Sequence, residues 1–166
     1  NGTSVVAIPG DLTITGGIQQ NTNAHDGNNM TQLGEVFSFS TGQIANTSNV
    51  TIKGTGRLDY TGTPGGITAS ANTTIAQTLA SLTFDNTGGQ APTVQIGNGD
   101  LTINGNITAG GTNVGRDAIA NISRSGTGVI NFGGATRSIN VSPVTVDGVA
   151  VEELLPALNI NAPIAN

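Results

Sequence analysis

The sequence contains no cysteine, few charged residues and few aromatic side chains. Without cysteine, the chain can form neither a disulfide framework nor a cysteine-based zinc site. Charged residues make up 9% and aromatic residues 3% of the 166 residues, whereas an ordinary domain has roughly 25% charge. The five basic residues are scattered singly and the net charge is −5, so nucleic-acid binding, which needs a concentrated basic face, is not expected.

Long apolar runs are also missing. No stretch approaches the roughly 20 residues of a transmembrane helix, so we expect no membrane insertion. The chain opens on Asn1 without a signal peptide, and we therefore expect a processed product or a fragment of a longer protein. Sparse charge together with abundant Asn and Thr is typical of secreted surface proteins, and we expect an extracellular, cell-surface location.

One short phrase recurs along the chain with small variations. It appears as GDLTITGGI from Gly10, as GDLTINGNI from Gly99 and as ALNINAPIA from Ala157. In each copy apolar residues alternate with Thr or Asn, which is the pattern of a half-buried strand. A strand phrase that returns along a chain indicates a repeat architecture, here a β-solenoid. Disorder is the rival interpretation, but the regular alternation of Ile and Val argues against it.

Short strands are predicted throughout, separated by turns rich in Gly and Asn. The predicted strands are Ser4–Ile8, Asp11–Thr15, Glu35–Ser40, Val50–Lys53, Gly56–Tyr60, Thr73–Ala76, Ser81–Asp85, Thr93–Ile96, Asp100–Asn104, Ala120–Ser123, Gly128–Phe132, Arg137–Val141, Val144–Val146 and Ala157–Asn161. Pairs such as Gly110-Gly111 and Gly133-Gly134 are predicted turns with positive φ. At about 20 residues per coil, the chain would hold roughly eight coils in one domain spanning 1–166, or a fragment of a longer solenoid. Asn-Gly pairs also suit hairpins, so an antiparallel β-sandwich fibre subunit stays open as the alternative.

Three segments do not show the alternating pattern of a strand. Gln19–Gly34 and Ala109–Ile119 are predicted loops or side excursions, and Val151–Leu155 could form one helical turn before Pro156. No linker divides the chain into domains.

Several phrases in the second half resemble the β-strand repeats of bacterial autotransporter passenger domains. They are LTFDNTGG, GNGDLTINGNITAGG, GTGVINFGGATRSINV and ALNINAPIA, which lie between Leu82 and Ala165. The resemblance implies a right-handed parallel β-helix displayed on the cell surface as an adhesin or a structural rod. It implies a scaffold rather than a site.

The candidate catalytic residues do not form a convincing site. His25 and Asp26 could in principle form a base and its orienter, but no partner is indicated, and a surface loop is expected. The carboxylates are spread along the chain, which gives little support to a glycan-cleaving enzyme. They are Asp11, Asp59, Asp85, Asp100, Asp117 and Asp147. Asp11 and Asp100 occupy the same place in the repeated phrase, so we expect both to cap turns.

Two further segments are similar to known binding motifs. The segment Gly97–Asp100 is the nearest approach to a calcium loop, but a single carboxylate rarely holds an ion, and we expect no metal or cofactor. Thr13 and Thr15 are typical of the outward rows of ice-binding solenoids. In the repeated phrase their equivalents are Thr102 and Asn104, then Asn159 and Asn161, so a regular threonine row is not expected.

The sequence therefore predicts a structural or adhesive surface protein that is not an enzyme. Neither end carries a polar cap, and we expect copies of the chain to stack head to tail into filaments. The predicted assembly edges are Leu12, Ile14, Ile18, Leu158, Ile160 and Ile164. The alternative is a carbohydrate-binding module or small glycan-active enzyme on a β-solenoid, with host or matrix glycans as partners.

Overall fold

The computed structural model describes residues 8–15, 35–37, 41–61, 74–87, 91–111, 119–146, 149–150 and 156–166. Within these ranges all regular elements are β-strands and no helix occurs. The strands form three sheets in which neighbours run parallel, apart from one antiparallel pair, β12 with β13. The prediction of an all-β protein is therefore confirmed. A search of the same ranges finds no helix that is long and apolar enough to span a membrane.

Each sheet draws its strands from segments that lie far apart in the chain. The first sheet has the order β1-β3-β6-β9-β12-β13, with β1 (Leu12–Thr15), β3 (Asn49–Lys53), β6 (Ser81–Asp85), β9 (Ile107–Gly111), β12 (Ile139–Val146) and β13 (Val149–Ala150). The second has the order β14-β10-β7-β4-β2, with β2 (Glu35–Phe37), β4 (Arg57–Asp59), β7 (Thr93–Ile96), β10 (Ala120–Arg124) and β14 (Leu158–Ile160). The third has the order β15-β11-β8-β5, with β5 (Gln77–Leu79), β8 (Leu101–Ile103), β11 (Ile130–Asn131) and β15 (Ile164–Ala165).

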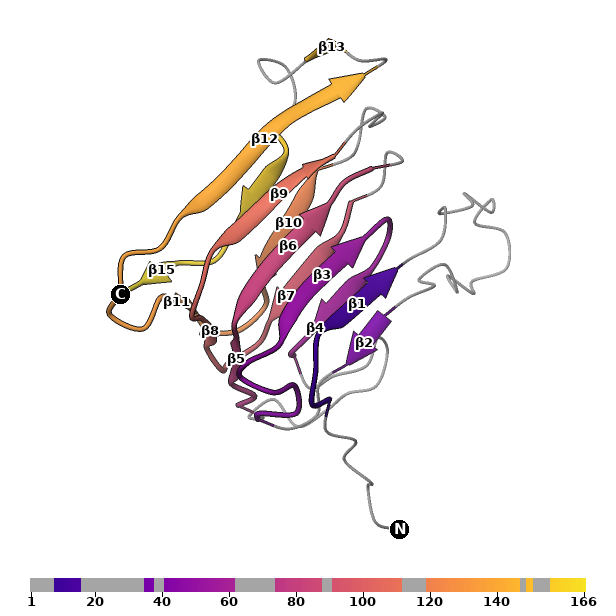
Figure 1. Cartoon of the computed structure of the whole chain (residues 1–166). Helices are drawn as coiled ribbons and strands as arrows, with labels where there is room; N and C mark the ends of the chain where they lie inside the picture. The colour runs from indigo at the N-terminus through magenta and orange to yellow at the C-terminus, as the bar shows by residue number, and fades with distance from the viewer. Residues whose placement is uncertain are drawn as a thin grey trace, which may run out of the picture.

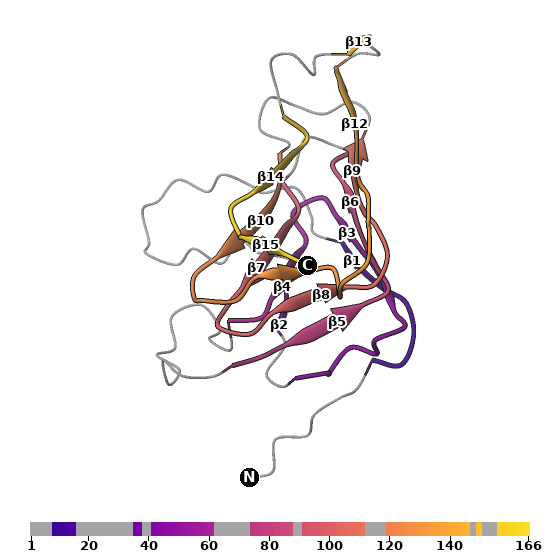
Figure 2. The same ribbon diagram turned by 90° about the vertical axis from the view of Figure 1, so that its left-hand side faces the viewer.

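The chain visits the three sheets in a fixed order, and we call one such pass a layer. Four layers lie within the described residues, namely β3-β4-β5, β6-β7-β8, β9-β10-β11 and β12-β14-β15, and β1 and β2 belong to the layer before them. Figure 1 shows the strands of the first sheet stacked from β1 at one end to β12 at the other. Figure 2 shows the three sheets on three sides of a common interior.

Alternate residues of every sheet point into the interior, and most of these residues are aliphatic. Val50, Leu82 and Ile107 lie in register on neighbouring strands of the first sheet, and each is 0% exposed. In the third sheet Leu101 and Ile103 are buried while Thr102 between them is half-exposed, as the alternation predicts. Stacking like side chains from layer to layer builds a mainly aliphatic core, to which Tyr60, Phe84 and Phe132 add three aromatic side chains.

The amide side chain of Gln77 also lies in the interior. Gln77 is 2% exposed, and its Nε2 donates to the carbonyl oxygen of Ile44 at 2.7 Å while its Oε1 accepts from the N–H of Ile44 at 3.2 Å. The buried amide of Gln77 is satisfied by the backbone of the preceding layer, as most buried polar groups in proteins are.

The repeated phrase does not stack on itself. Leu12 lies in the first sheet, Leu101 in the third and Leu158 in the second, so the three copies occupy different sides of the core. The partners of Leu12 in register are instead Val50 and then Leu82. The layers are unequal in length and longer than assumed, which is why no clean period appears and why the expectation of roughly eight coils is wrong.

Glycine has two different roles in the stack. Gly54, Gly133 and Gly134 have positive φ values of 59°, 64° and 74°, which confirms turns at these positions. Gly110 and Gly111, in contrast, lie inside β9, so the predicted turn there is wrong. A Cβ atom on Gly111 would lie 2.5 Å from the backbone nitrogen of Thr87, and glycine is therefore needed because two layers approach closely.

The strand predictions differ from the structure at several places. Ser81–Asp85 and Thr93–Ile96 are correct, but Thr73–Ala76 is displaced because the strand there is β5, Gln77–Leu79. The sequence analysis missed β9, β13 and β15. Two predicted segments lie outside the described residues, namely the loop Gln19–Gly34 and the helical turn Val151–Leu155. Residues 112–118 of the predicted loop Ala109–Ile119 also lie outside them.

Parallel pairing throughout the stack does not fit the antiparallel sandwich that was considered as an alternative. Within the described residues the three sheets remain separate, with no strand pairing between one sheet and another. The structure thus establishes an all-β chain with parallel sheets, and the right-handed β-helix stays a prediction.

Candidate functional site

Two carboxylates bind backbone amides of a neighbouring layer. Asp11 Oδ1 accepts from the backbone N–H of Asn49 at 2.8 Å, and Asp100 Oδ1 accepts from the N–H of Val129 at 3.0 Å. Both side chains precede a strand and hold the corner of the layer stacked on it. The prediction that Asp11 and Asp100 cap turns is thus corrected, because each carboxylate accepts from a backbone N–H of the next layer instead.

The segment Gly97–Asp100, which the sequence compares with a calcium loop, also links neighbouring layers. Asn98 Oδ1 accepts from the N–H of Thr127 at 3.2 Å, in the following layer. A Cβ atom on Gly99 would lie 2.2 Å from the carbonyl carbon of Ile75, so this glycine allows close contact between layers. In the described part of the chain, no group of three or more His, Asp or Glu side chains is placed to hold a metal ion.

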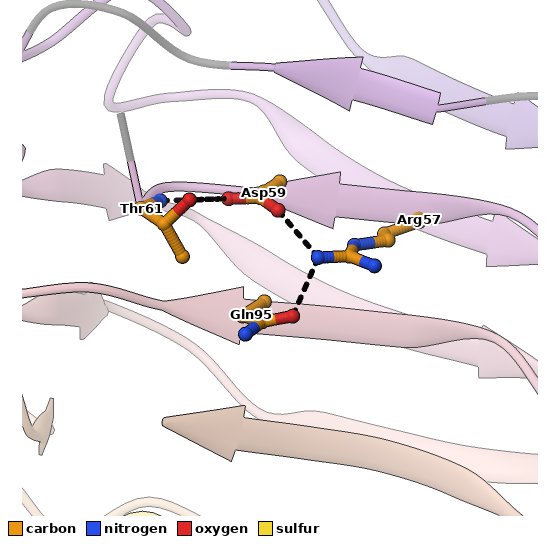
Figure 3. Close-up of polar contacts among 4 residues, drawn as sticks. All are labelled: Arg57, Asp59, Thr61 and Gln95. Carbon is orange, nitrogen blue, oxygen red and sulfur yellow. Dashed lines mark hydrogen bonds and ion pairs between the residues drawn. The ribbon is translucent and has the colours of Figure 1, made fainter. Parts of the chain in front are cut away.

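A buried ion pair lies on the second sheet. Leu58 points into the core, so Arg57 and Asp59 project from the other face of β4, yet the Asp59 side chain is only 1% exposed. Arg57 Nη2 lies 2.6 Å from Asp59 Oδ2 and also donates to Gln95 Oε1 on β7. The second carboxylate oxygen, Oδ1, accepts from the backbone N–H and the hydroxyl of Thr61 at 2.7 and 2.6 Å (Figure 3).

This arrangement satisfies the Asp59 carboxylate with a cation, a backbone amide and a hydroxyl. The three donors fix the position of this buried carboxylate, which is shielded from solvent. The Arg57–Asp59 pair joins β4 to β7 through Gln95 and fixes the chain where it leaves β4 at Thr61. We interpret it as a structural element rather than a catalytic carboxylate.

Asp85 lies on the first sheet, in register with Lys53 of the adjacent strand. Lys53 Nζ is 3.6 Å from Asp85 Oδ2, and both side chains are partly exposed. The Thr87 hydroxyl is the largest influence lowering the pKa of Asp85, aided by the Thr87 backbone N–H and the Lys53 charge and opposed by partial burial. The pair leaves this part of the sheet with little net charge.

The candidate carboxylates do not form one cluster. Asp59 is on the second sheet and Asp85 on the first, while Asp11 and Asp100 lie at corners. His25, Asp26, Asp117 and Asp147 lie outside the described residues.

The outer face of the first sheet carries a row of threonines that the sequence analysis did not predict. Thr13, Thr51, Thr83 and Thr108 are in register on β1, β3, β6 and β9. The row changes to Asn140 on β12. The sequence-based prediction wrongly took Thr102 and Asn159 as the equivalents of Thr13. Those residues belong to other sheets. Spacing within a phrase could not reveal this row, because the layers differ in length.

A shallow groove of about 540 Å³ crosses this face. It spans β3, β6, β9 and β12, and so runs across the strands along the stack. Thr51, Thr83 and Thr108 line it, Gly110 contributes a stretch without side chains, and Pro143 of β12 borders it. The ladder between β9 and β12 is irregular between Val141 and Val144, where β12 bulges.

The predicted assembly edges lie on strands that end their sheets. Leu12 and Ile14 are in β1, Leu158 and Ile160 in β14, and Ile164 in β15. Ile18 lies outside the described residues. Ile14 is buried, whereas Ile164 is 50% exposed.

Comparisons with models of protein families, with curated proteins and with solved structures find no match for this chain. The resemblance to autotransporter passenger domains therefore stays a prediction that rests on the quoted strand phrases.

Proposed function

We propose that this chain is an extracellular structural or adhesive surface element, built as a right-handed β-helix whose copies stack end to end into filaments. Parallel strands in register over successive layers support the β-helix, because a chain that visits three sheets in a fixed order advances by one strand spacing per pass. The autotransporter-like phrases support the location and the adhesive or structural role.

The observation that carries the assembly proposal is the exposure of apolar side chains in the layer formed by β12, β14 and β15. Ile164 is 50% exposed, while Ile130, its partner in register one layer earlier, is 0% exposed. Val141 is likewise 50% exposed, and its partner Ala109 is 0% exposed. One more layer placed on these strands would bury apolar side chains that already stack in register, and burial of such surface is the main driving force of association.

Among the described residues, no strand pairs with the outer edge of β14. The N–H of Asn161 donates to the carbonyl oxygen of Ile122 at 2.8 Å, and Ile122 lies in register with Ile160. In a parallel ladder only alternate residues bond to a given neighbour, so the N–H and C=O of Ile160 point away from β10. An added parallel strand would pair with these groups, and the first layer of another copy can supply it. Such a contact is heterologous and does not close.

Sedimentation velocity over a concentration series, with electron microscopy of the same samples, tests the assembly. We expect the wild type to form filaments and Ile164→Lys to stay monomeric, because a charge would be buried at the contact. Ile160→Pro should also block assembly, because it removes a donor from the open edge of β14 and leaves the bond to Ile122 intact.

Thr127→Lys is the matched control. It introduces the same charge at an exposed corner between β10 and β11, and it should assemble like the wild type. A wild type that stays monomeric at the highest concentration would refute the filament proposal, and so would equal loss of assembly in Ile164→Lys and Thr127→Lys. Fibre diffraction from oriented filaments should show a repeat near 4.8 Å along the fibre if the stack is continuous.

We assign the chain no catalytic role and expect no hydrolase or lyase activity on surface glycans, with or without calcium. Turnover of such a glycan that disappears in Asp59→Asn, Asp85→Asn or His25→Ala would contradict this assignment.

A further inference from the structure

We propose that the threonine-lined groove on the first sheet binds one strand of a neutral polysaccharide, which lies across β3, β6, β9 and β12. The groove includes β12 of the terminal layer but lies on the outer face of the first sheet, so binding here does not require end-to-end assembly. Its floor is the register row Thr51, Thr83 and Thr108, and its volume is about 540 Å³.

The row provides hydroxyls that the fold does not use. Thr51, Thr83 and Thr108 are half-exposed, and their side chains make no hydrogen bond to another residue in the described ranges. Each threonine presents a methyl group beside a hydroxyl, and each can donate and accept. Polar groups placed among apolar surface in a concave site are what fixes the orientation of a ligand.

The spacing of the row suits a ligand that repeats. In-register residues on adjacent strands are separated by about 4.8 Å, so successive threonine hydroxyls recur at this interval along the groove. The units of an extended polysaccharide recur at an interval of similar size, and in a β-1,4-linked chain every second unit presents the same face. A ligand of this class can therefore present a hydroxyl to each threonine and the same face to alternate threonines.

The charges beside the row favour a neutral ligand. The row that flanks the threonines contains Lys53 and Asp85, which pair at 3.6 Å, and then Gly110. Because the cation and the anion are matched, neither a polyanion nor a polycation gains much from this surface.

The shape of the groove favours a single strand over a flat surface. A Cβ atom on Gly110 would lie 2.8 Å from Ser142 Cβ, so the floor there is tightly packed and has no projecting side chain. Pro143 and Thr145 of β12 border the same hollow. An ice plane needs a flat and uniform array, whereas this face is concave and its second row is Thr15, Lys53, Asp85 and Gly110.

Calorimetric titration with cellohexaose, chitohexaose and mannohexaose tests the proposal. We expect at least one of these hexasaccharides to bind the wild type, and Thr83→Val to weaken that binding roughly three- to ten-fold, since it removes one hydrogen-bonding hydroxyl and keeps the shape. Thr83→Glu should abolish binding, because it places a bulky charge in the centre of the groove.

Thr102→Val and Thr102→Glu are the controls. Thr102 is also a half-exposed strand threonine, but it lies on β8 of the third sheet, away from the groove. Both control variants should bind like the wild type, and binding should persist in about 0.5 M sodium chloride because no net charge is involved.

Three results would overturn the proposal. The first is that none of the three hexasaccharides binds, and the second is that substitutions at Thr83 and Thr102 have equal effects. The third is that the wild type shows the thermal hysteresis of an ice-binding protein, that Thr83→Glu loses it, and that no sugar binds. The same titration on Ile164→Lys separates this proposal from the filament proposal, because a monomer with an intact groove should still bind.

Discussion

The carboxylate of Asp100 accepts the backbone N–H of Val129, 3.0 Å away in the next layer of the stack. The bond links two corners that the chain reaches 29 residues apart. Asp11 bonds to Asn49 in the same way, and Asn106 Oδ1 accepts from the N–H of Ser138 at 3.1 Å. Side chains that precede strands thus hold the layers together at the corners, where the sheet ladders are interrupted.

Asp100→Ala should lower the free energy of unfolding by about 1 kcal/mol, because the Val129 amide loses its acceptor. Asp100→Asn keeps a side-chain oxygen at this position and should lose much less. Urea denaturation of the two variants measures the difference. Equal losses would mean that the charge of Asp100, rather than its hydrogen bond, stabilises the corner.

Ile103→Asp should cost several kcal/mol, since Ile103 is 0% exposed and an unpaired charge would enter the aliphatic core. Thr102→Asp, one residue earlier and on the outer face, should change stability by less than about 0.5 kcal/mol. Chemical denaturation checks both values. Similar losses from the two substitutions would refute the assignment of inner and outer faces in β8.

The Arg57–Asp59 pair should show strong coupling. Arg57→Ala leaves the Asp59 carboxylate buried without its cation and should cost about 3–5 kcal/mol, the usual penalty for breaking a buried pair from one side. The double variant Arg57→Ala/Asp59→Ala should be less destabilised than the sum of the single variants. Additive losses in a double-mutant cycle would show that the two side chains act independently.

Tyr60 should make the protein sensitive to alkali. Its side chain is 1% exposed, its hydroxyl has no hydrogen-bond partner in the described ranges, and burial raises the pKa of the phenol well above its ordinary value. Because the folded pKa exceeds the unfolded one, this contribution to stability is complete below about pH 10 and is lost as the pH rises above it.

Tyr60→Phe should remove this alkaline loss and leave stability at neutral pH unchanged or slightly higher, because an unsatisfied buried hydroxyl disappears. Tyr60 is the only tyrosine in the sequence, so ultraviolet absorbance reports its ionisation without interference. In the wild type, phenolate should appear together with the loss of strand signal in circular dichroism. Ionisation of Tyr60 in a fully folded protein would contradict the prediction.

Much of the strand content could be predicted from local pattern alone. The alternation in Leu101–Ile103 and Ser81–Asp85 depends only on the two-residue period of a strand beside an aliphatic interior, and both strands lie where the pattern places them. β9 was missed because Gly110 and Gly111 have the composition of a turn. Their actual role is to let the backbone of another layer approach, and that neighbour is distant in sequence.

The sequence by itself determined the class of protein: an all-β chain with a thin, mainly aliphatic core. Only the tertiary structure decided which residues are equivalent. Thr13 shares its row with Thr51, Thr83 and Thr108, and not with Thr102 of the repeated phrase, because the register follows pairing between layers of unequal length. The physical reason is that a strand phrase fixes which side chains point inward, while the length of the intervening corners fixes which strands become neighbours.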